Sequence, residues 1–310
     1  MSCLTPLMYR PAPAARSRLR STATALCLSL GLGLGLGTWL PAHAINNGTP
    51  TTAFAPVGFF GVQVAPDWVL TANHVAAAFF PIGASTIAFS NGLGERTVID
   101  RFDAPGATGF PANDLTLLRL APGAASSFFQ PLSSDLFSVG SFAALNVTIA
   151  SAANSTLPRA FGHTTVTEFA AQIDPDDDGP QGLVTVNYLL SFDASVYVQS
   201  GDSGGGLFFG HVLDSASAPL LGLSSAQLGD EGQPPAGSGF VQLAPYRSWL
   251  DATMASAAGN TQQLNWVTAI PEPGTWLLFG LGLAGLAART ALRDRAGSHA
   301  HPNEAARTYA

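Results

Sequence analysis

Short apolar segments alternate with clusters of turn-forming residues over most of the chain, from about residue 50 to residue 245. The segments are rich in Val, Ile, Phe and Leu, and they are separated by Gly, Pro, Asn, Ser and Asp. Segments of this kind at this spacing are typical of the strands of an all-β barrel or sandwich. The clearest predicted strands are Val57–Val64, Trp68–Thr71, Ser85–Phe89, Leu115–Leu120, Leu145–Ala150, Leu183–Leu190, Gly205–Phe209 and Leu220–Leu223.

One segment after these predicted strands has a helical period instead. Between Pro245 and Ala257, the apolar residues Trp249, Leu250 and Met254 are spaced so that they share one face of a helix. The pattern predicts a helix that closes the β domain.

The N-terminal segment has the pattern of an export signal. An apolar, glycine-interrupted run from Ala23 to Leu40 follows a basic stretch and ends at Pro41-Ala42-His43-Ala44. A basic region, an apolar region and an A-x-A site in this order indicate a signal peptide over residues 1–44, to be removed by signal peptidase. A membrane anchor or a low-complexity Leu-Gly tract is the alternative. The basic residues are Arg10, Arg16, Arg18 and Arg20.

Composition narrows the picture once this segment is set aside. Both cysteines, Cys3 and Cys27, fall inside it, so the mature chain is predicted to have no disulfide and no cysteine metal site. Between Ile45 and Ile270 five arginines, no lysines and seventeen acidic residues give a net charge near −12. Because binding to phosphate backbones needs clustered Lys and Arg, we expect no nucleic-acid partner.

The C-terminal segment has a second targeting pattern. A polar stretch over 258–270 reads as a linker, and Pro271-Glu272-Pro273 then precedes an apolar run from Trp276 to Leu286. The run is shorter than the roughly 20 apolar residues of a comfortable transmembrane helix. Arg289, Arg293 and Arg295 follow it and would hold that end on the cytoplasmic side.

In this order, the Pro-Glu-Pro tripeptide, the short apolar run and the basic cluster resemble the PEP-CTERM sorting signal of Gram-negative bacteria. The resemblance implies a hydrophobic helix over 271–295 that is transiently a transmembrane helix in the inner membrane, followed by a tail over 296–310. It also implies recognition by an exosortase-like enzyme and delivery to the cell surface or the extracellular medium. A plain C-terminal membrane anchor is the alternative.

Three separated segments carry candidate chemistry. In the first, glycines flank Ser203 within Gln199-Ser200-Gly201-Asp202-Ser203-Gly204-Gly205, so the backbone can turn tightly and expose the hydroxyl. The backbone amides of Gly201 and Ser203 are then candidates for an oxyanion hole. Alone, such a motif also fits a surface turn.

The other two segments supply a base and an acid. His74 directly follows an apolar strand and a Thr71-Ala72 step, and Asp114 opens the apolar strand over Leu115–Leu120. Alone, a histidine here fits a core or surface role, and the aspartate fits a strand-end cap. Together with a serine they supply the nucleophile, the proton acceptor and the orienting carboxylate that amide hydrolysis needs.

The order His, Asp, Ser and the local motifs Thr-Ala-x-His, Asn-Asp-hydrophobic and Gly-Asp-Ser-Gly-Gly resemble the chymotrypsin/trypsin family of serine proteases. The resemblance covers residues 45–257. It implies two six-stranded antiparallel Greek-key β-barrels with a short C-terminal helix, and a triad of His74, Asp114 and Ser203. The α/β-hydrolase order needs an acid and then a histidine after the serine. The only later histidine before the C-terminal signal is His211, and no acid lies between Ser203 and His211, so the chain does not fit that order.

The resemblance also implies an activation pair and a substrate pocket. Cleavage after Ala44 would release the ammonium of Ile45, which would insert beside Asp202. Counting from Ser203 places the S1 pocket, and its floor has no acid to select Arg or Lys. We therefore expect a narrow pocket for small or medium uncharged side chains. The residues assigned to it are Tyr197, Val198, Ser225, Ala226, Gln227 and Gly239.

No cofactor is expected, with one candidate for calcium. Asp174, Asp176 and Asp178 match the first half of a D-x-D-x-D-G loop, but Thr185 stands where the full loop needs a bidentate Glu. A solvated acidic turn is the preferred interpretation. The sequence as a whole predicts an exported serine endopeptidase acting on protein or peptide substrates. A catalytically silent binding or adhesion module with the same fold, and an esterase, are the alternatives.

Overall fold

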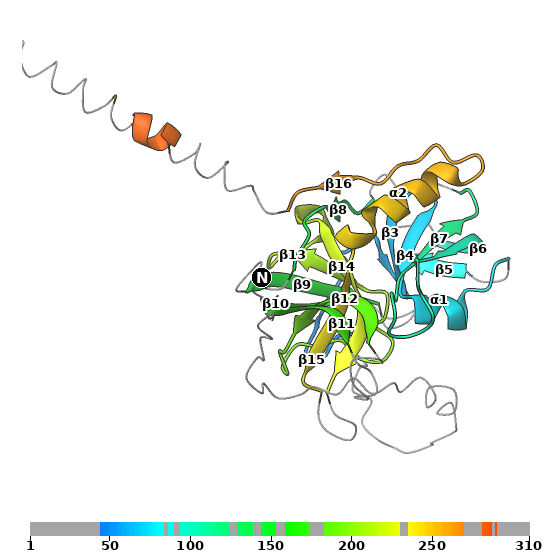
Figure 1. Ribbon diagram of the computed structural model, residues 1–310, viewed down its shortest axis with the longest axis horizontal. Coiled ribbons are helices and arrows are strands. Elements are labelled where there is room, and N and C mark those ends of the chain that lie inside the picture. The colour runs from blue at the N-terminus through cyan, green and yellow to red at the C-terminus, as the bar shows by residue number, and fades with distance from the viewer. Residues whose placement is uncertain are drawn as a thin grey trace, which may run out of the picture. The chain divides into compact units, whose positions relative to one another are not determined.

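The predicted apolar segments form two antiparallel β-sheets that lie side by side, with α2 packed across them (Figure 1). The computed structural model describes residues 44–83, 86–89, 94–123, 129–138, 140, 144–152, 159–173, 183–229, 235–269, 281–286 and 289. The all-β fold with a short C-terminal helix, predicted from the sequence, is confirmed.

The first sheet has six strands in the order β2-β3-β4-β7-β6-β5. Strand β5 returns alongside β2, so the sheet curls into a barrel. Its register pairs Thr71 of β4 with Thr116 of β7. The strands are β2 (Val57–Gly58), β3 (Gly61–Ala65), β4 (Trp68–Thr71), β5 (Thr86–Phe89), β6 (Gly94–Asp103) and β7 (Thr116–Leu120).

The second sheet has the order β1-β10-β9-β13-β14-β15-β12-β11, with β8 and β16 attached at β14. Strand β10 continues after Thr167 into β11, which pairs with β12, so this sheet also closes on itself. The short strands β1, β8 and β16 come in addition to the barrel. The strands are β1 (Thr49–Thr51), β8 (Leu132–Ser133), β9 (Leu145–Ser151), β10 (Arg159–Val166), β11 (Glu168–Ile173), β12 (Val184–Ser191), β13 (Gly206–Phe209), β14 (Leu220–Leu228), β15 (Gly237–Gln242) and β16 (Trp266–Val267).

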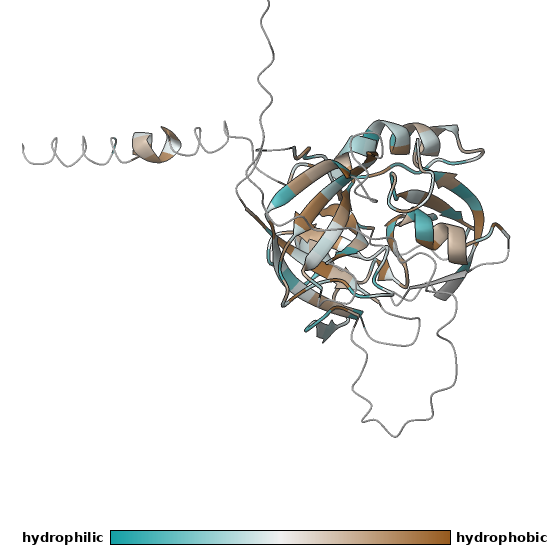
Figure 2. Ribbon diagram, turned by 60° about the horizontal axis from the view of Figure 1, so that its bottom comes forward, coloured by the Kyte–Doolittle hydropathy of each residue, from teal (hydrophilic) through white to brown (hydrophobic). Residues whose placement is uncertain are grey.

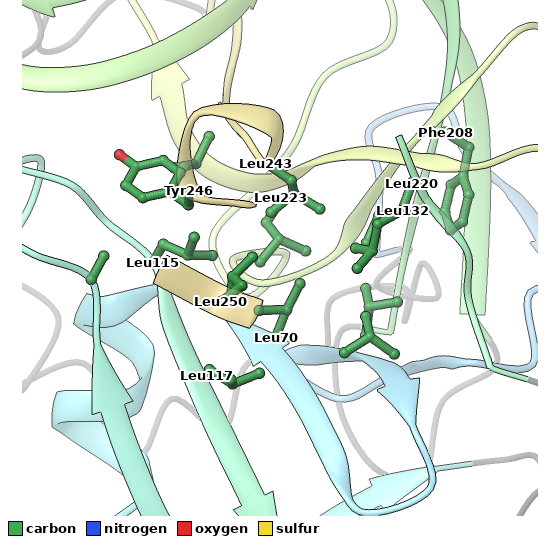
Figure 3. Packing of buried hydrophobic residues seen from close by; sticks show 14 of the residues in the cluster. Leu70, Leu115, Leu117, Leu132, Phe208, Leu220, Leu223, Leu243, Tyr246 and Leu250 are labelled. Atoms are coloured by element: carbon green, nitrogen blue, oxygen red, sulfur yellow. The ribbon is translucent and has the colours of Figure 1, made fainter. Parts of the chain in front are cut away.

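A single apolar cluster joins the two barrels. Leu70 and Leu117 from the first sheet pack with Leu223 and Phe208 from the second (Figure 3). Hydrophobic residues, drawn in brown, recur along the strands of both barrels (Figure 2). Because no cysteine lies in residues 45–310, this packing rather than a disulfide holds the halves together.

The predicted C-terminal helix is confirmed, with a different start. Helix α2 (Arg247–Ser256) follows the 3-10 turn η3 (Ala244–Tyr246), which takes up the proline at the predicted start. Leu250 and Met254 are buried in the cluster between the barrels. Fully burying a side chain of this size contributes about 1.5–3 kcal/mol.

The segment after α2 corrects the prediction of a linker over 258–270, because it is folded as far as Ala269. Its strand β16 pairs in parallel with β8. Asn260 Oδ1 accepts a hydrogen bond from Trp68 Nε1 at 3.1 Å, and Gln262 bonds both the backbone and the carboxylate of Asp67. The polar side chains that gave this segment the composition of a linker thus bond to the first barrel.

The chain divides into one unit over Met1–Ala269 and a second over Ile270–Ala310. Of the second, the structure describes only residues 281–286 and 289, which are helical. No helix within the described ranges is long and apolar enough to cross a membrane, so the predicted transmembrane helix over 271–295 is not found there. Residues 1–43 and the calcium candidates Asp174, Asp176 and Asp178 lie outside the described residues.

Candidate active site

Two neighbouring strand ends bring His74 and Asp114 together. Helix α1 (Asn73–Phe79) starts just after β4, and Asp114 lies just before β7. Because β4 and β7 are antiparallel, the end of one strand and the start of the other lie at the same edge of the first barrel. The sequence separation of the two residues is thus closed by strand pairing.

Hydrogen bonds link three of the predicted site residues in a row. His74 Nδ1 lies 2.8 Å from Asp114 Oδ2, and His74 Nε2 lies 3.0 Å from Ser203 Oγ. The His74 backbone N–H also donates to Asp114 Oδ1 at 2.8 Å. Asp114 is fully buried, whereas the His74 side chain is 30% exposed. A buried acceptor on one side and an accessible face on the other suit an imidazole that moves a proton between the hydroxyl and a substrate.

Ser203 lies in a tight turn ahead of β13. Gly201 and Gly204 have φ angles of +99° and +82°, which side chains rarely adopt. A Cβ on Gly204 would lie 2.3 Å from the Phe60 carbonyl oxygen. The Gly204 N–H donates to Ser224 O at 2.8 Å and holds the turn against β14. The glycines of the motif are therefore required by the path of the backbone beside the serine.

The predicted oxyanion-hole donors, the backbone amides of Gly201 and Ser203, lie in this turn. Among the described residues, neither the Gly201 N–H nor the Ser203 N–H has a hydrogen-bond acceptor. The amides of Asp202 and Gly205 within the same turn do have acceptors, the carbonyls of Gln199 and Asp202. The two predicted donors are therefore among the amides of this motif that have no acceptor within the described part of the chain.

Asp202 is buried and only partly satisfied. Its Oδ2 accepts the Gln199 N–H at 2.7 Å, but its Oδ1 has no hydrogen-bond partner among the described residues. Burial raises the pKa of Asp202 to about 7, and bonds from the Gln199 amide and the Ser151 hydroxyl offset this in part. A buried carboxylate oxygen without a donor is costly and fits a group that awaits a cation.

The segment that would begin the mature chain is docked on the loop before Ser203. Ile45 is fully buried and forms an antiparallel bridge with Val198, and the Asn46 N–H donates to Tyr197 O at 3.0 Å. The side-chain amides of Asn46 and Asn47 both donate to the Ser195 carbonyl, at 2.9 and 2.8 Å. The two asparagine side chains thus hold this segment against the loop.

The residues assigned to the S1 pocket have different environments. Val198 is buried in a cluster with Ile45, Ala226 is buried, and Tyr197 is half-buried. Gln227 is exposed on β14. Gly239 leaves room for a neighbouring aromatic ring, because a Cβ there would lie 3.2 Å from Tyr188 Cδ2.

The side chain of Ser225, a residue assigned to the pocket wall, bonds to Asp114. Its hydroxyl donates to Asp114 Oδ2, and the hydroxyl of Tyr188 lies 2.7 Å from Ser225 Oγ. The Ser225 side chain therefore belongs to the surroundings of Asp114, which leaves only its backbone for a pocket.

Two neighbours of the site were not predicted from the sequence. Tyr188 lies on β12 and is fully buried. A tyrosine in a buried strand needs a hydrogen-bond partner for its hydroxyl, and this need was the feature of the sequence that could have indicated Tyr188. Phe110 contacts His74 edge-on, with ring centroids 5.4 Å apart, and no sequence pattern indicates this contact. Within the described residues no group of three or more His, Cys, Asp or Glu could hold a metal ion.

Two family models match the chain. The Trypsin family model matches residues 58–250, and the model of the PEP-CTERM protein-sorting motif matches residues 269–293. No curated protein matches the chain. A mutant of human heparin binding protein aligns at 19% identity and a TM-score of 0.49, covering 70% of this chain and 99% of that one. An inactivated protease paralogue of the scabies mite aligns at 17% identity and a TM-score of 0.46, covering 63% and 88%.

Proposed function

The chain belongs to the trypsin family, and on this premise we propose that it is an exported serine endopeptidase with His74, Asp114 and Ser203 as its catalytic triad. The observation that carries the proposal is the pair of hydrogen bonds on the imidazole of His74, at 2.8 Å to Asp114 and 3.0 Å to Ser203. Both distances lie within the range in which a proton is transferred or held.

In the proposed reaction, Ser203 Oγ attacks the scissile carbonyl carbon and its proton passes to His74 Nε2. The carbonyl oxygen becomes an oxyanion, which the amides of Gly201 and Ser203 stabilise. The intermediate then collapses, the C–N bond breaks, and His74 returns the proton to the leaving amine. Water repeats the sequence on the acyl-enzyme and releases Ser203. Throughout, Asp114 keeps the Nδ1–H of His74 in place and stabilises the imidazolium.

We propose that substrates with small or medium uncharged P1 side chains are preferred. Tyr197 stands where an acid would select Arg or Lys, and the exposed Gln227 replaces a residue that is commonly glycine. The test is a peptide library cleaved by the protein that begins at Ile45, read by mass spectrometry. We expect cleavage after residues such as Ala, Ser or Val. A profile dominated by P1 Arg or Lys would contradict this specificity and leave the peptidase activity established.

We also propose that removal of the signal peptide activates the enzyme through Asp202. The ammonium released at Ile45 would supply the cation that the buried carboxylate lacks. In a chain extended beyond Ile45, the folded-state pKa of about 7 exceeds the unfolded value. The protonated carboxylate is then the favoured form in the folded state, so this group stabilises below about pH 4 and loses that contribution as the pH rises through 7.

The corresponding prediction compares unfolding free energies from pH 4 to 8 by urea denaturation. The N-terminally extended parent should lose on the order of 4 kcal/mol of unfolding free energy between pH 4 and pH 8. The Asp202→Asn variant of that chain should not show this loss. In the chain that begins at Ile45, the ion pair lowers the pKa, and Asp202→Asn should instead destabilise throughout by about 3–5 kcal/mol. Parallel pH curves for the parent and the Asp202→Asn variant of the extended chain would rule out the raised pKa.

The PEP-CTERM motif indicates export and membrane-associated sorting by an exosortase-like enzyme in a Gram-negative bacterium. We propose that the hydrophobic segment holds the protein in the inner membrane until that enzyme acts, and that the folded domain then reaches the cell surface or the medium. In this account the domain faces the exported side, where its peptide substrates are.

A further inference from the structure

Tyr188 extends the hydrogen-bonded row of the active site by one residue beyond the triad. It lies on β12 of the second barrel, is fully buried, and its hydroxyl is 2.7 Å from Ser225 Oγ. Ser225 in turn bonds Asp114 Oδ2, the same oxygen that His74 Nδ1 contacts. The row therefore runs from Tyr188 through Ser225 and Asp114 to His74.

The direction of every proton in this row is fixed by the chemistry of its members. An ionised carboxylate only accepts hydrogen bonds, so Ser225 donates its single proton to Asp114. The remaining contact of Ser225 Oγ must then be one in which it accepts, which makes the Tyr188 hydroxyl the donor. Burial, followed by the charge of Asp114, raises the pKa of Tyr188 well above its usual value, so it retains this proton.

Packing holds the Tyr188 ring where this bond needs it. A Cβ added to Gly239 would lie 3.2 Å from Tyr188 Cδ2 and 3.3 Å from Ala226 Cβ, so the glycine leaves the space that the ring occupies. The backbone of Tyr188 pairs with Val241 of β15. The ring is thus placed by the barrel itself, independently of the hydroxyl.

We propose that Tyr188 is a positioning residue for catalysis, whose hydroxyl orients Ser225 so that the Ser225 proton faces Asp114. This role rests on the proposed peptidase function. It makes Tyr188, a residue of the second barrel, act on Asp114 of the first barrel. Donation by Tyr188 polarises the Ser225 hydroxyl and strengthens its bond to Asp114. The carboxylate then attracts the imidazolium of His74 less strongly than it would without Tyr188.

The titratable groups around Asp114 come from three elements. They are His74 from α1, Tyr188 from β12 and Tyr246 from η3, whose hydroxyl donates to Asn113 Oδ1 at 2.7 Å. Asp103 at the end of β6 is further away. It accepts a hydrogen bond from the Thr116 hydroxyl, which in turn accepts one from Asn73, the residue before His74. Among these, Tyr188 alone bonds Ser225.

The test is Tyr188→Phe, which keeps the ring and removes the hydroxyl. We expect kcat to fall about threefold with KM unchanged, because Ser225 no longer holds Asp114 as firmly in the position that orients His74 and one neutral hydrogen bond is lost. In proton NMR, the resonance of the His74 Nδ1–H should move downfield, since its bond to Asp114 strengthens. The matched control is Tyr246→Phe, which removes a buried hydroxyl nearby and should change neither kcat nor the resonance.

A double variant separates this role from a general effect on packing. If Tyr188 acts through Ser225, Tyr188→Phe has no further effect on kcat or the resonance once Ser225→Ala is present. Equal effects in both backgrounds, or an unchanged resonance and kcat in Tyr188→Phe, would overturn the inference. The resonance can be measured without turnover. If the parent protein is inactive but Tyr188→Phe still shifts the His74 resonance, the peptidase function is refuted and the positioning role of Tyr188 is kept.

Discussion

Replacing Ser203 by alanine is expected to lower kcat for peptide hydrolysis by about 10⁶-fold, because the variant has no oxygen nucleophile. The backbone turn should survive the change, since Gly201 and Gly204 set its path and alanine adds no atom that serine lacks. The measurement is the initial rate of hydrolysis of a peptide substrate. Ser256→Ala, which removes an exposed hydroxyl on α2, is the matched control and should retain full activity.

The same experiment tests whether the three residues act as one unit. His74→Ala should cost about as much as Ser203→Ala, and the double variant should be no slower than either, because each change already removes the same proton-transfer step. Additive losses, or a Ser203→Ala protein with more than a few per cent of the parent rate, would place the activity elsewhere.

The second large effect is expected for Asp114→Asn, at about 10⁴-fold in kcat. The amide of asparagine is a donor and favours the His74 tautomer that carries its proton on Nε2, where it cannot take the proton of Ser203. In the parent protein, both Asp114 oxygens accept hydrogen bonds from His74, and Oδ2 also accepts one from Ser225. All three bonds need an oxygen acceptor at this position, and asparagine keeps only one.

Asp103→Asn provides the control for this change. Asp103 is a carboxylate at the same edge of the first barrel, bonded to Thr116 and Arg101 rather than to His74. Steady-state kinetics should give a rate within about threefold of the parent for Asp103→Asn. A loss below tenfold for Asp114→Asn would assign the orienting role to another group.

Much of the fold followed from the sequence because its core strands are short, apolar and bounded by turn residues. Trp68–Thr71 was predicted with both of its ends, and Leu145–Ala150 to within one residue. Strand β6 escaped notice because Arg96, Asp100 and Arg101 interrupt its apolar pattern. Arg96 pairs with Asp67 and Asp100 with Arg119, and the sequence cannot indicate these contacts between different parts of the barrel.

The site shows the same division between local and tertiary information. Gly201 and Gly204 mark the serine turn in the sequence because glycine supplies the positive φ angles found there. The partner of a hydroxyl is set by strands that are distant in sequence, so the bonds of Ser225 to Asp114 and Tyr188 were not predicted. The folded segment up to Ala269 was missed for the same reason, since its polar residues bond to the remote Asp67 and Trp68.

The central claim is that the Ser203 hydroxyl is an activated nucleophile, and a fluorophosphonate probe tests it most directly. The Ser203 oxygen should displace fluoride from phosphorus, with His74 accepting the proton. For the protein that begins at Ile45, the account predicts one label per chain on the peptide that contains Ser203, and no label in Ser203→Ala. An intact, folded protein that stays unlabelled would contradict the account and leave a silent binding module.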